Sequence, residues 1–525
     1  MTNYNITNGL FDRAARNPNK AALIVSCKRL FRDPGEKIIS YRRISMDTIS
    51  TADVLKARGF KKGDRILVFI PMSYSLYVTI LAILYIGAEA VFIDAWANRK
   101  RLTDCCKVVK PGGFIGSAMA QILRMDPEVR RIPIKLMDHQ VVSLDNGERG
   151  NDLKACPAEV NDGDTAIITL TTGTTGLPKG VDRTYGMLRN QFSILSNRLK
   201  LEKTDVDLTV LPILILQNLG LGVTSVLPLV SPAKPTAFSP PLIVKQILKH
   251  GVTTSQGSPA FYEKLADYIL ENNIILPLRQ IVIGGAPVFK HMAQKLIQAF
   301  PATEIEVVYG CTEALPIGAI PIKKLVQYDP ERGLPVGQKV KEIDVAVVRP
   351  QDGPIILNEG ETLSDFLAPQ GEAGEIIVKG PHVLQRYLGN PEIGRQNKIT
   401  AGDEVWHRTG DAGCLDPQGN IFLLGRIGRR FFADGACRYP IPYEQRLRAV
   451  PEVAFCAVLE HEGLIHAVIE LKKKARCDKD RLLEQIKTIL ADIKPHKYIF
   501  LNEIPRDPRH NSKIDYERLG KLLPN

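Results

Sequence analysis

Short apolar runs alternate along the chain with longer stretches in which apolar residues recur at helical spacing. Runs typical of buried strands cover residues 65–71, 90–93, 166–170, 281–283 and 306–309, and stretches typical of helices cover 74–86, 243–250 and 293–300. Strands that are separated by helices form parallel sheets with helices on both faces. The pattern therefore predicts an α/β fold with parallel-rich sheets flanked by helices.

The pattern changes near residues 426–430. Residues 416–426 predict a hairpin, and a new alternation follows, with paired strands at 453–460 and 464–471 and a helix at 480–493. The length of 525 residues also favours more than one domain, because single cores rarely grow past roughly 250–300 residues. We therefore predict a large N-terminal domain, residues 1–427, and a small α+β C-terminal domain, residues 428–525.

The charge balance is positive. Lys and Arg number 69 against 57 Asp and Glu, an excess of 12, which favours anionic partners. The basic residues are spread along the chain and do not interleave with aromatic residues as in a recognition module. Small anions such as nucleotides therefore fit better than nucleic acid, which we do not expect as a partner.

The cysteines and the apolar segments indicate a compartment. Nine cysteines occur at irregular spacing without a CxxC motif, which indicates free thiols in a reducing compartment and neither disulfides nor zinc. The first 18 residues are polar and lack the apolar core of a signal peptide. The apolar segments 66–86 and 208–230 are interrupted by proline and polar residues, which is typical of a protein core. We expect a cytoplasmic protein without a transmembrane segment.

Residues 170–181 combine glycines, hydroxyl side chains and a lysine directly after a predicted buried strand. They are Leu-Thr-Thr-Gly-Thr-Thr-Gly-Leu-Pro-Lys-Gly-Val. Glycines let the backbone approach a ligand closely, and successive backbone N–H groups can form an anion-binding nest. The segment is therefore suited to holding a polyphosphate. A Walker-type P-loop is excluded, because Ser or Thr would have to follow the lysine, and Gly180 follows Lys179.

At this segment the chain resembles the adenylate-forming superfamily, which includes acyl-CoA ligases, luciferases and the adenylation domains of peptide synthetases. Further short signatures of that superfamily follow in its order: Gly284-Gly285-Ala286-Pro287, Tyr309-Gly310-Cys311-Thr312-Glu313, Gly374-Glu375-Ile376, Thr409-Gly410-Asp411, Gly425-Arg426 and Asn511-Ser512-Lys513-Ile514. Each string is weak alone, but the ordered set spans nearly the whole chain. The resemblance implies that ATP and Mg²⁺ are used to activate a small-molecule carboxylic acid as its acyl-adenylate.

The resemblance also assigns a nucleotide site. Gly285, Ala286 and Pro287 would form one wall of the adenine pocket, with Tyr309 stacked on the base, and Gly310 would be a further nucleotide-binding residue. Asp411, whose carboxylate offers two acceptor oxygens, would bind the ribose hydroxyls together with Arg426. The β- and γ-phosphates would be held by Thr171, Thr172, Gly173, Thr174, Thr175, Gly176 and Lys179.

Three residues would act on the reacting groups. Adenylation brings together two anions, a carboxylate and the α-phosphate, so preorganised donors and cations are needed. By resemblance, Thr312 contacts the α-phosphate, Glu313 holds Mg²⁺, a hard cation that takes oxygen ligands, and Lys513 bridges the two anions. Lys513 would enter for the first step and withdraw for the second, so the C-terminal domain is expected to be a mobile lid.

The chain departs from the superfamily after Arg426. Gly428 stands where relatives usually have an acidic or basic residue, and Arg429-Arg430-Phe431-Phe432 replaces a more polar pattern. This departure argues against the usual second step, in which coenzyme A is the co-substrate and a thioester forms. Residues 214–222 are apolar where relatives have an aromatic residue or histidine near the acyl pocket, which suits a fatty chain.

Four strings are similar to those of the β-lactone synthetases of bacterial olefin biosynthesis: 219–228, 309–316, 406–416 and 509–514. That resemblance implies adenylation of a long-chain 3-hydroxy acid and ring closure by its own hydroxyl, which exploits a high effective molarity. It also implies partner enzymes of a lipid or olefin pathway. The alternatives are a fatty acyl-CoA ligase, an adenylation enzyme that loads a carrier protein, and a non-catalytic nucleotide- or acyl-binding relative. The last is disfavoured because Thr312, Glu313, Asp411 and Lys513 are all present.

Overall fold

The computed structural model describes residues 5–29, 32–93, 99–142, 155–172, 178–230, 237–389, 391–472, 478–506 and 513–524, without the side chains of 27–34 and 171–172. The chain forms two compact units. Unit 1 comprises Met1–Gln256, Leu276–Arg279 and Pro381–Gly394, and unit 2 comprises Gly257–Ile275, Gln280–Gly380 and Arg395–Asn525. The predicted boundary after residue 427 is a different division and stays a prediction.

Unit 1 contains a seven-stranded sheet in the order β18-β8-β7-β4-β3-β5-β6. The strands from β7 to β6 run parallel, whereas β8 is antiparallel to both β7 and β18. Its strands are β3 (Arg65–Phe69), β4 (Glu89–Ile93), β5 (Gly113–Gly116), β6 (Ile134–Met137), β7 (Thr165–Thr172), β8 (Pro178–Thr184) and β18 (Tyr387–Leu388).

A second set of strands in unit 1 has the order β11-β9-β10-β1-β2, and all neighbours are parallel except β1 and β2. These strands are β1 (Ala21–Arg29), β2 (Arg32–Ser40), β9 (Val206–Thr209), β10 (Thr224–Val226) and β11 (Thr254–Gly257). The helices are α1 (Asn8–Arg16), α2 (Tyr41–Ala57), α3 (Tyr74–Tyr85), α4 (Arg99–Val109), η1 (Met119–Met125), α5 (Pro127–Arg131), α6 (Asp138–Val141), α7 (Tyr185–Leu199), α8 (Pro212–Leu221) and α9 (Pro240–His250), and α13 (Pro391–Asn397) begins in this unit.

The two apolar segments of unit 1 are core elements. Helix α3 is capped by Ser73, whose Oγ accepts from the Leu76 N–H, and all of its residues except Ser75 are buried. A helix that is apolar on all sides is stable only inside a core. Its residues join α2 and α8 in one hydrophobic cluster, as expected for both segments. Among the described helices, none is both long enough and apolar enough to span a membrane.

Unit 2 carries strands in the order β16-β17-β20-β21-β15-β14-β13-β12, with β19 beside β20. Only the pair β12–β13 is parallel, because between residues 304 and 426 the strands follow one another without long helices. The strands are β12 (Gln280–Gly284), β13 (Glu304–Cys311), β14 (Ala314–Pro321), β15 (Leu334–Lys339), β16 (Asp344–Val348), β17 (Gly374–Lys379), β19 (Lys398–Ala401), β20 (Glu404–Leu415) and β21 (Asn420–Arg426). The helices are α10 (Pro259–Glu271), α11 (Lys290–Ala299), α12 (Ile322–Leu325), η2 (Pro330–Arg332), η3 (Leu363–Phe366) and η4 (Ile427–Arg429).

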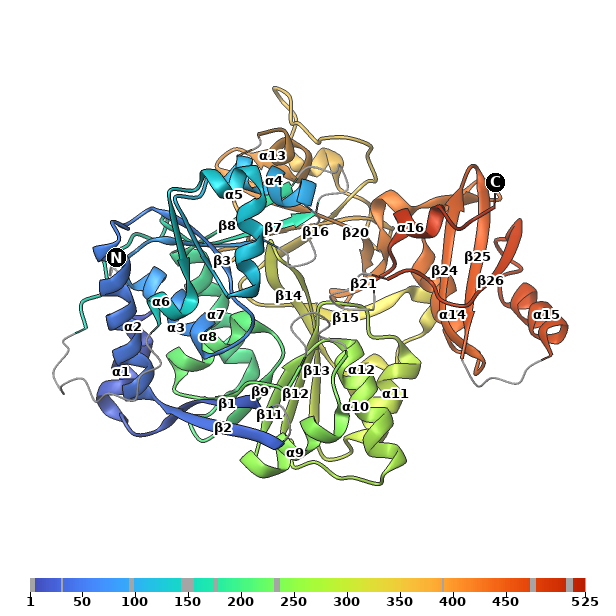
Figure 1. Ribbon diagram of the computed structural model, residues 1–525. Helices are drawn as coiled ribbons and strands as arrows, with labels where there is room; N and C mark the ends of the chain where they lie inside the picture. Colours follow the sequence, from blue (N-terminus) through green and yellow to red (C-terminus); the bar gives the residue numbers. More distant parts are fainter. Residues whose placement is uncertain are drawn as a thin grey trace. The chain divides into compact units, whose positions relative to one another are not determined.

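The C-terminal part of unit 2, coloured orange to red in Figure 1, is built on a three-stranded sheet. One face packs on the helices α14 and α15, and the other on the segment that ends in α16, so the sheet has apolar clusters on both faces. The elements are β22 (Phe431–Ala433), β23 (Ala436–Arg438), α14 (Pro440–Arg448), β24 (Val453–His461), β25 (Leu464–Leu471), α15 (Lys479–Ile489), β26 (Lys497–Leu501) and α16 (Tyr516–Gly520).

The predicted α/β class is confirmed. Each of the strands and helices predicted from periodicity is present, with ends that shift by a few residues. The predicted hairpin at 416–426 is the turn and second strand of the β20–β21 pair, and the predicted pair 453–460 and 464–471 is β24–β25. The strands of unit 2 are mostly antiparallel, whereas the periodicity indicated parallel strands.

Candidate functional site

The carboxylate of Asp411 is the centre of a polar cluster in unit 2. The Tyr309 hydroxyl donates to Oδ2 of Asp411 at 2.8 Å, and Nη1 of Arg426 donates to Oδ1 at 2.6 Å. Burial, and then the negative charge of Asp411, raises the pKa of the Tyr309 hydroxyl well above its usual range, so it stays a proton donor at neutral pH. The same carboxylate raises the pKa of Arg426. Three predicted site residues are thus brought together.

Strand pairing explains this meeting. Asp411 lies directly opposite Arg426 in the antiparallel β20–β21 register, so their side chains are neighbours on the sheet. Arg426 also donates to the backbone oxygen of Thr409 at 3.2 Å. Each carboxylate oxygen can accept two hydrogen bonds. Asp411 can therefore accept from the expected ribose hydroxyls in addition to Tyr309 and Arg426.

A buried ion pair supports the backbone that presents Asp411. Arg408 donates to Oε2 of Glu375 from Nε at 2.9 Å and from Nη2 at 2.6 Å. The other oxygen of Glu375 accepts from the backbone N–H of Gly410 at 3.1 Å. Gly410 has φ +71°, and an added Cβ would lie 2.8 Å from Arg426. Only glycine therefore fits this position of β20 without displacing the arginine.

The predicted adenine wall lies at the end of a neighbouring strand. Gly284, the last residue of β12, pairs with Val308 in the parallel β12–β13 register, whereas β13 continues to Cys311. Gly285, with φ +90°, Ala286 and Pro287 follow β12, and Tyr309 and Gly310 follow Val308. A Cβ on Gly310 would come within 2.7 Å of the Ala314 oxygen, so this glycine permits the close approach of β13 and β14.

Thr312 and Glu313 form the two-residue turn between β13 and β14, since Cys311 pairs with Ala314. Both turn residues are half-buried. Lys398, which is 8% exposed at the start of β19, interacts electrostatically with Glu313 and Cys311. Burial lowers the pKa of Lys398 to about 7, although Glu313 and Cys311 act in the opposite direction.

The described part of the predicted phosphate segment lies in unit 1 and forms the paired ends of two strands. The strand β7 continues to Thr172 and pairs with β8, with Thr171 opposite Lys179. The sequence placed Thr171, Thr172 and Lys179 in a loop, whereas the structure places them on the ends of two strands. The ammonium of Lys179 lies 5.9 Å above the ring of Tyr387 in β18. Gly173, Thr174, Thr175 and Gly176 lie outside the described residues.

Lys513, the predicted catalytic lysine, is exposed in unit 2. The next residue, Ile514, forms an isolated antiparallel bridge with Arg506, and Arg506 is paired with Glu470 on β25. The C-terminal sheet thus fixes the chain just beyond Lys513. Lys513 takes no part in the contacts described for Asp411.

Comparison with known proteins shows the family of the chain. The AMP-binding enzyme family matches residues 10–388 of the 525-residue chain. The chain belongs to the AMP-binding enzyme family. It is an AMP-forming acid ligase, in agreement with the resemblance found in the sequence.

Curated relatives of this AMP-binding enzyme cover nearly its whole length. It is 27% identical to the olefin beta-lactone synthetase of Xanthomonas campestris pv. campestris, over 92% of this chain and 90% of the relative. It is also 27% identical to the long-chain-fatty-acid–CoA ligase FadD13 of Mycobacterium tuberculosis, over 90% of both chains. Among solved structures, the O-succinylbenzoate coenzyme A synthetase of Bacillus subtilis in complex with ATP and magnesium aligns with a TM-score of 0.77 at 22% identity, over 98% of this chain and 99% of that chain. This last likeness supports the fold.

The apolar segment expected near the acyl group is helix α8 of the AMP-binding enzyme. Leu214, Ile215, Leu216 and Leu219 are buried, and the last three pack in the main hydrophobic cluster of unit 1. Gln217 and Asn218 on the same helix donate to Ser196 and Asp207. The helix is thus a core element in this structure, and its contact with a fatty chain stays a prediction.

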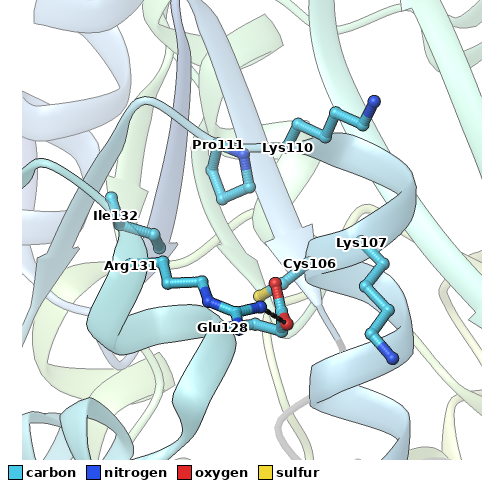
Figure 2. A pocket seen from close by; sticks show the side chains of 7 residues that line it. All are labelled: Cys106, Lys107, Lys110, Pro111, Glu128, Arg131 and Ile132. Atoms are coloured by element: carbon cyan, nitrogen blue, oxygen red, sulfur yellow. Dashed lines mark hydrogen bonds and ion pairs between the residues drawn. The ribbon is translucent and has the colours of Figure 1, made fainter.

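Unit 1 also contains a shallow basic pocket. Figure 2 shows the residues that line it, which lie on α4, on α5 and in the turns after them. On α5, Arg131 pairs with Glu128. The residues that line it are Cys106, Lys107, Lys110, Pro111, Glu128, Arg131 and Ile132. None of the seven was a predicted site residue.

Sequence reasoning missed the residues that support the site. Glu375 and His407 lay in strings quoted for the resemblance but received no role, and Lys398 was not considered. A buried acidic residue inside an apolar strand, such as Glu375 in β17, is a signal that could have been used, because buried carboxylates are normally paired. The sequence held no such signal for Lys398.

Proposed function

We propose that this enzyme uses ATP and Mg²⁺ to convert a long-chain fatty or 3-hydroxy fatty acid into its acyl-AMP, and that a 3-hydroxy group then closes a β-lactone. The observation that carries the proposal is the Tyr309–Asp411–Arg426 cluster beside the Thr312–Glu313 turn, in a chain whose curated relatives include olefin beta-lactone synthetases. The cluster supplies acceptors and a cation for a ribose, and the turn supplies a hydroxyl and a carboxylate for the reacting phosphate.

The first step joins two anions. A carboxylate oxygen of the substrate attacks the α-phosphorus, the bond to the β-phosphate breaks, and pyrophosphate leaves. In this proposal Thr312 donates to the α-phosphate, and Lys513 neutralises the meeting charges. The β7–β8 hairpin, with Thr171, Thr172 and Lys179 and the segment Gly173–Gly176 between the strands, holds the departing phosphates.

The donors at the β13–β14 turn fit Mg²⁺. Glu313 offers a half-buried carboxylate and Thr312 a hydroxyl, and oxygen ligands are those that this hard cation prefers. Glu313 would hold the ion, which when bound offsets negative charge on the phosphate oxygens. The nearby Cys311 thiol is a soft donor and has no role toward magnesium.

In the second step the 3-hydroxyl oxygen of the substrate attacks the acyl carbon. The bond to AMP breaks, AMP leaves with its electron pair, and the hydroxyl proton passes to solvent. This ring closure needs no second substrate, because nucleophile and electrophile are held in one molecule. Residues 428–525 would act as the lid that brings Lys513 in for the first step. This proposal is supported by the two apolar clusters of the C-terminal sheet, in which all the described residues lie at or beyond Phe431.

A fatty acyl-CoA ligase is the second candidate. The observation that favours it is the equal identity of 27% to the long-chain-fatty-acid–CoA ligase FadD13. Coenzyme A would then be the co-substrate, and its thiol would displace AMP. A D-alanine–D-alanyl carrier protein ligase from Streptococcus pyogenes is also 27% identical, which keeps transfer to a carrier protein as a third outcome.

Product analysis separates these outcomes. The enzyme is incubated with ATP, Mg²⁺ and a panel of fatty and 3-hydroxy fatty acids, with and without coenzyme A, and pyrophosphate, AMP and acyl products are measured by mass spectrometry. We expect AMP and a β-lactone from 3-hydroxy acids without coenzyme A. Strict dependence on coenzyme A would establish the ligase instead. A complete lack of pyrophosphate across the panel would leave a binding protein without adenylation activity.

A further inference from the structure

Among the described residues, one group of Cys, His and carboxylate side chains has the spacing of a metal site. Cys311 at the end of β13, Glu313 in the following turn and His407 on β20 each offer a ligand atom, and these atoms lie within 4.8 Å of one another. Sγ of Cys311 is 3.9 Å from Nε2 of His407. The distance of 3.9 Å is close to that between two ligands of one tetrahedral ion, since metal–ligand bonds are about 2.0–2.3 Å long.

The orientation of His407 supplies a second, independent observation. Its Nδ1 lies 3.2 Å from the backbone oxygen of Asn397. A carbonyl oxygen only accepts, so Nδ1 carries the proton in the neutral ring, and the lone pair of Nε2 faces Cys311. Metal-binding histidines are held in this way, with the far ring nitrogen donating to a carbonyl or carboxylate. The imidazole is 2% exposed, so the surrounding chain fixes it in this position.

The donor types select the ion. Sulfur of cysteine and nitrogen of histidine are ligands of zinc and other thiophilic cations, whereas Mg²⁺ takes oxygen ligands. We propose that Cys311, His407 and Glu313 form a zinc site beside the adenylation turn, and that zinc bound there inhibits the enzyme. On binding, the Cys311 thiol forms a bond to Zn²⁺ and releases its proton to solvent.

Inhibition follows from the shared ligand, and this part rests on the proposed function. Glu313 is the residue proposed to hold Mg²⁺, and its carboxylate cannot serve both ions in the same geometry. Zinc at the Cys311–Glu313–His407 site would also lie next to Thr312, the proposed contact of the α-phosphate. Trace zinc would therefore lower pyrophosphate release until a chelator or a stronger thiol ligand removes it.

Lys398 opposes this binding. It is buried, and its charge interacts with both Glu313 and Cys311. In its protonated form, the Lys398 ammonium repels a divalent cation and competes for the Glu313 carboxylate. The variant Lys398→Met keeps the length of the side chain and removes the charge, so it should bind the metal more tightly than the wild type.

Cobalt titration of the full-length protein tests the site without any substrate. Co²⁺ bound by a thiolate gives a near-ultraviolet charge-transfer band, and we expect one equivalent per chain, reversed by Zn²⁺. Cys311→Ser should abolish the band, and His407→Gln should weaken binding about 10-fold or more. Cys414→Ser is the matched control, because Cys414 is a half-buried thiol on the same strand as His407 and lies outside the group. It should leave the band unchanged.

The outcomes are distinct from those of the proposed function. A band that survives in Cys311→Ser, or the lack of any band in folded wild-type protein, would overturn the zinc site whether or not the enzyme adenylates. Failure of adenylation shows instead as missing pyrophosphate from zinc-free wild type with Mg²⁺. Where adenylation occurs, each variant's rate with added zinc is compared with its own zinc-free rate. Cys311→Ser should lose most of the inhibition, and Lys398→Met should be inhibited at lower zinc.

Discussion

The Tyr309–Asp411–Arg426 cluster and the β7–β8 hairpin carry the two halves of the proposed nucleotide site, and they are built differently. In the cluster, side chains from three strands meet at 2.6–2.8 Å, and a buried ion pair holds the backbone behind them. In the hairpin, backbone pairing of two adjacent strands fixes Thr171 and Lys179. The side chains of a preorganised polar network stabilise one another, so the loss of one weakens the others. A substitution at the end of a hairpin affects only its immediate surroundings. Substitutions in the cluster should therefore affect folding and binding together, and substitutions in the hairpin only binding.

Glu375→Ala should have the largest effect, because it removes the support of the cluster. Glu375 and Arg408 are 3% and 6% exposed, and removing one partner of a buried pair costs about 3–5 kcal/mol by leaving the other charge uncompensated. The Gly410 N–H also loses its acceptor. We expect a lower urea midpoint and weaker ATP binding in the same variant.

Glu404→Ala is the matched control for Glu375→Ala. Glu404 likewise pairs with a cation, Lys379 on β17, but the side chain of Glu404 is 53% exposed. Solvent screens such a pair, so the urea midpoint should hardly change. Equal losses of stability in the two variants would show that the buried pair has no special role in holding the cluster.

Lys513→Ala tests the proposed catalytic residue, which belongs to neither half. The charge of Lys513 is proposed to act when the two anions meet, so its loss should lower kcat for pyrophosphate release about 10²–10³-fold with little change in ATP affinity. Lys521→Ala is the control, since Lys521 is an exposed lysine near the same C-terminus and pairs with Glu517. Equal rates for Lys513→Ala and wild type would remove Lys513 from the mechanism.

The sequence predicted most of the elements of both halves. Periodicity found the strands that carry Leu170 and Tyr309, because alternation of strands and helices is a local property of the chain. It did not predict β20, the strand that carries Asp411. Motif order found the paired residues themselves. It could not show that Tyr309 donates to Asp411, 102 positions away, since that contact depends on the register of strands far apart in sequence.

The same limit explains what the sequence interpreted wrongly or missed. Thr171 and Thr172 were placed in a loop because glycine follows them, yet pairing with β8 extends the strand through both. Spacing of the cysteines along the chain argued against zinc. Spacing along the chain says nothing about Cys311 and His407, which lie 96 positions apart and meet only in the fold.

Asp411→Asn probes the cluster at its acceptor. The amide keeps the size of the carboxylate but removes the charge, and hydrogen bonds to charged groups contribute about 1.5–3 kcal/mol, so KM for ATP should rise about 10- to 100-fold. Tyr309→Phe removes one donor to the carboxylate but leaves the carboxylate itself in place, so KM for ATP should rise less. The comparison is made on KM for ATP and on the urea midpoint. An unaltered KM in Asp411→Asn would argue against the ribose assignment.

Thr171→Val probes the hairpin with the smallest expected effect. Valine has the shape of threonine without the hydroxyl, and β-branched residues suit a strand. The loss of one hydrogen bond to phosphate should raise KM for ATP by a factor that corresponds to about 0.5–1.5 kcal/mol, at an unchanged urea midpoint. Thr165→Val, at the other end of the same strand, should change neither quantity. If Thr171→Val lowered the midpoint as well, the hairpin would be as strongly coupled to the fold as the cluster is, and the contrast between the two halves would fail.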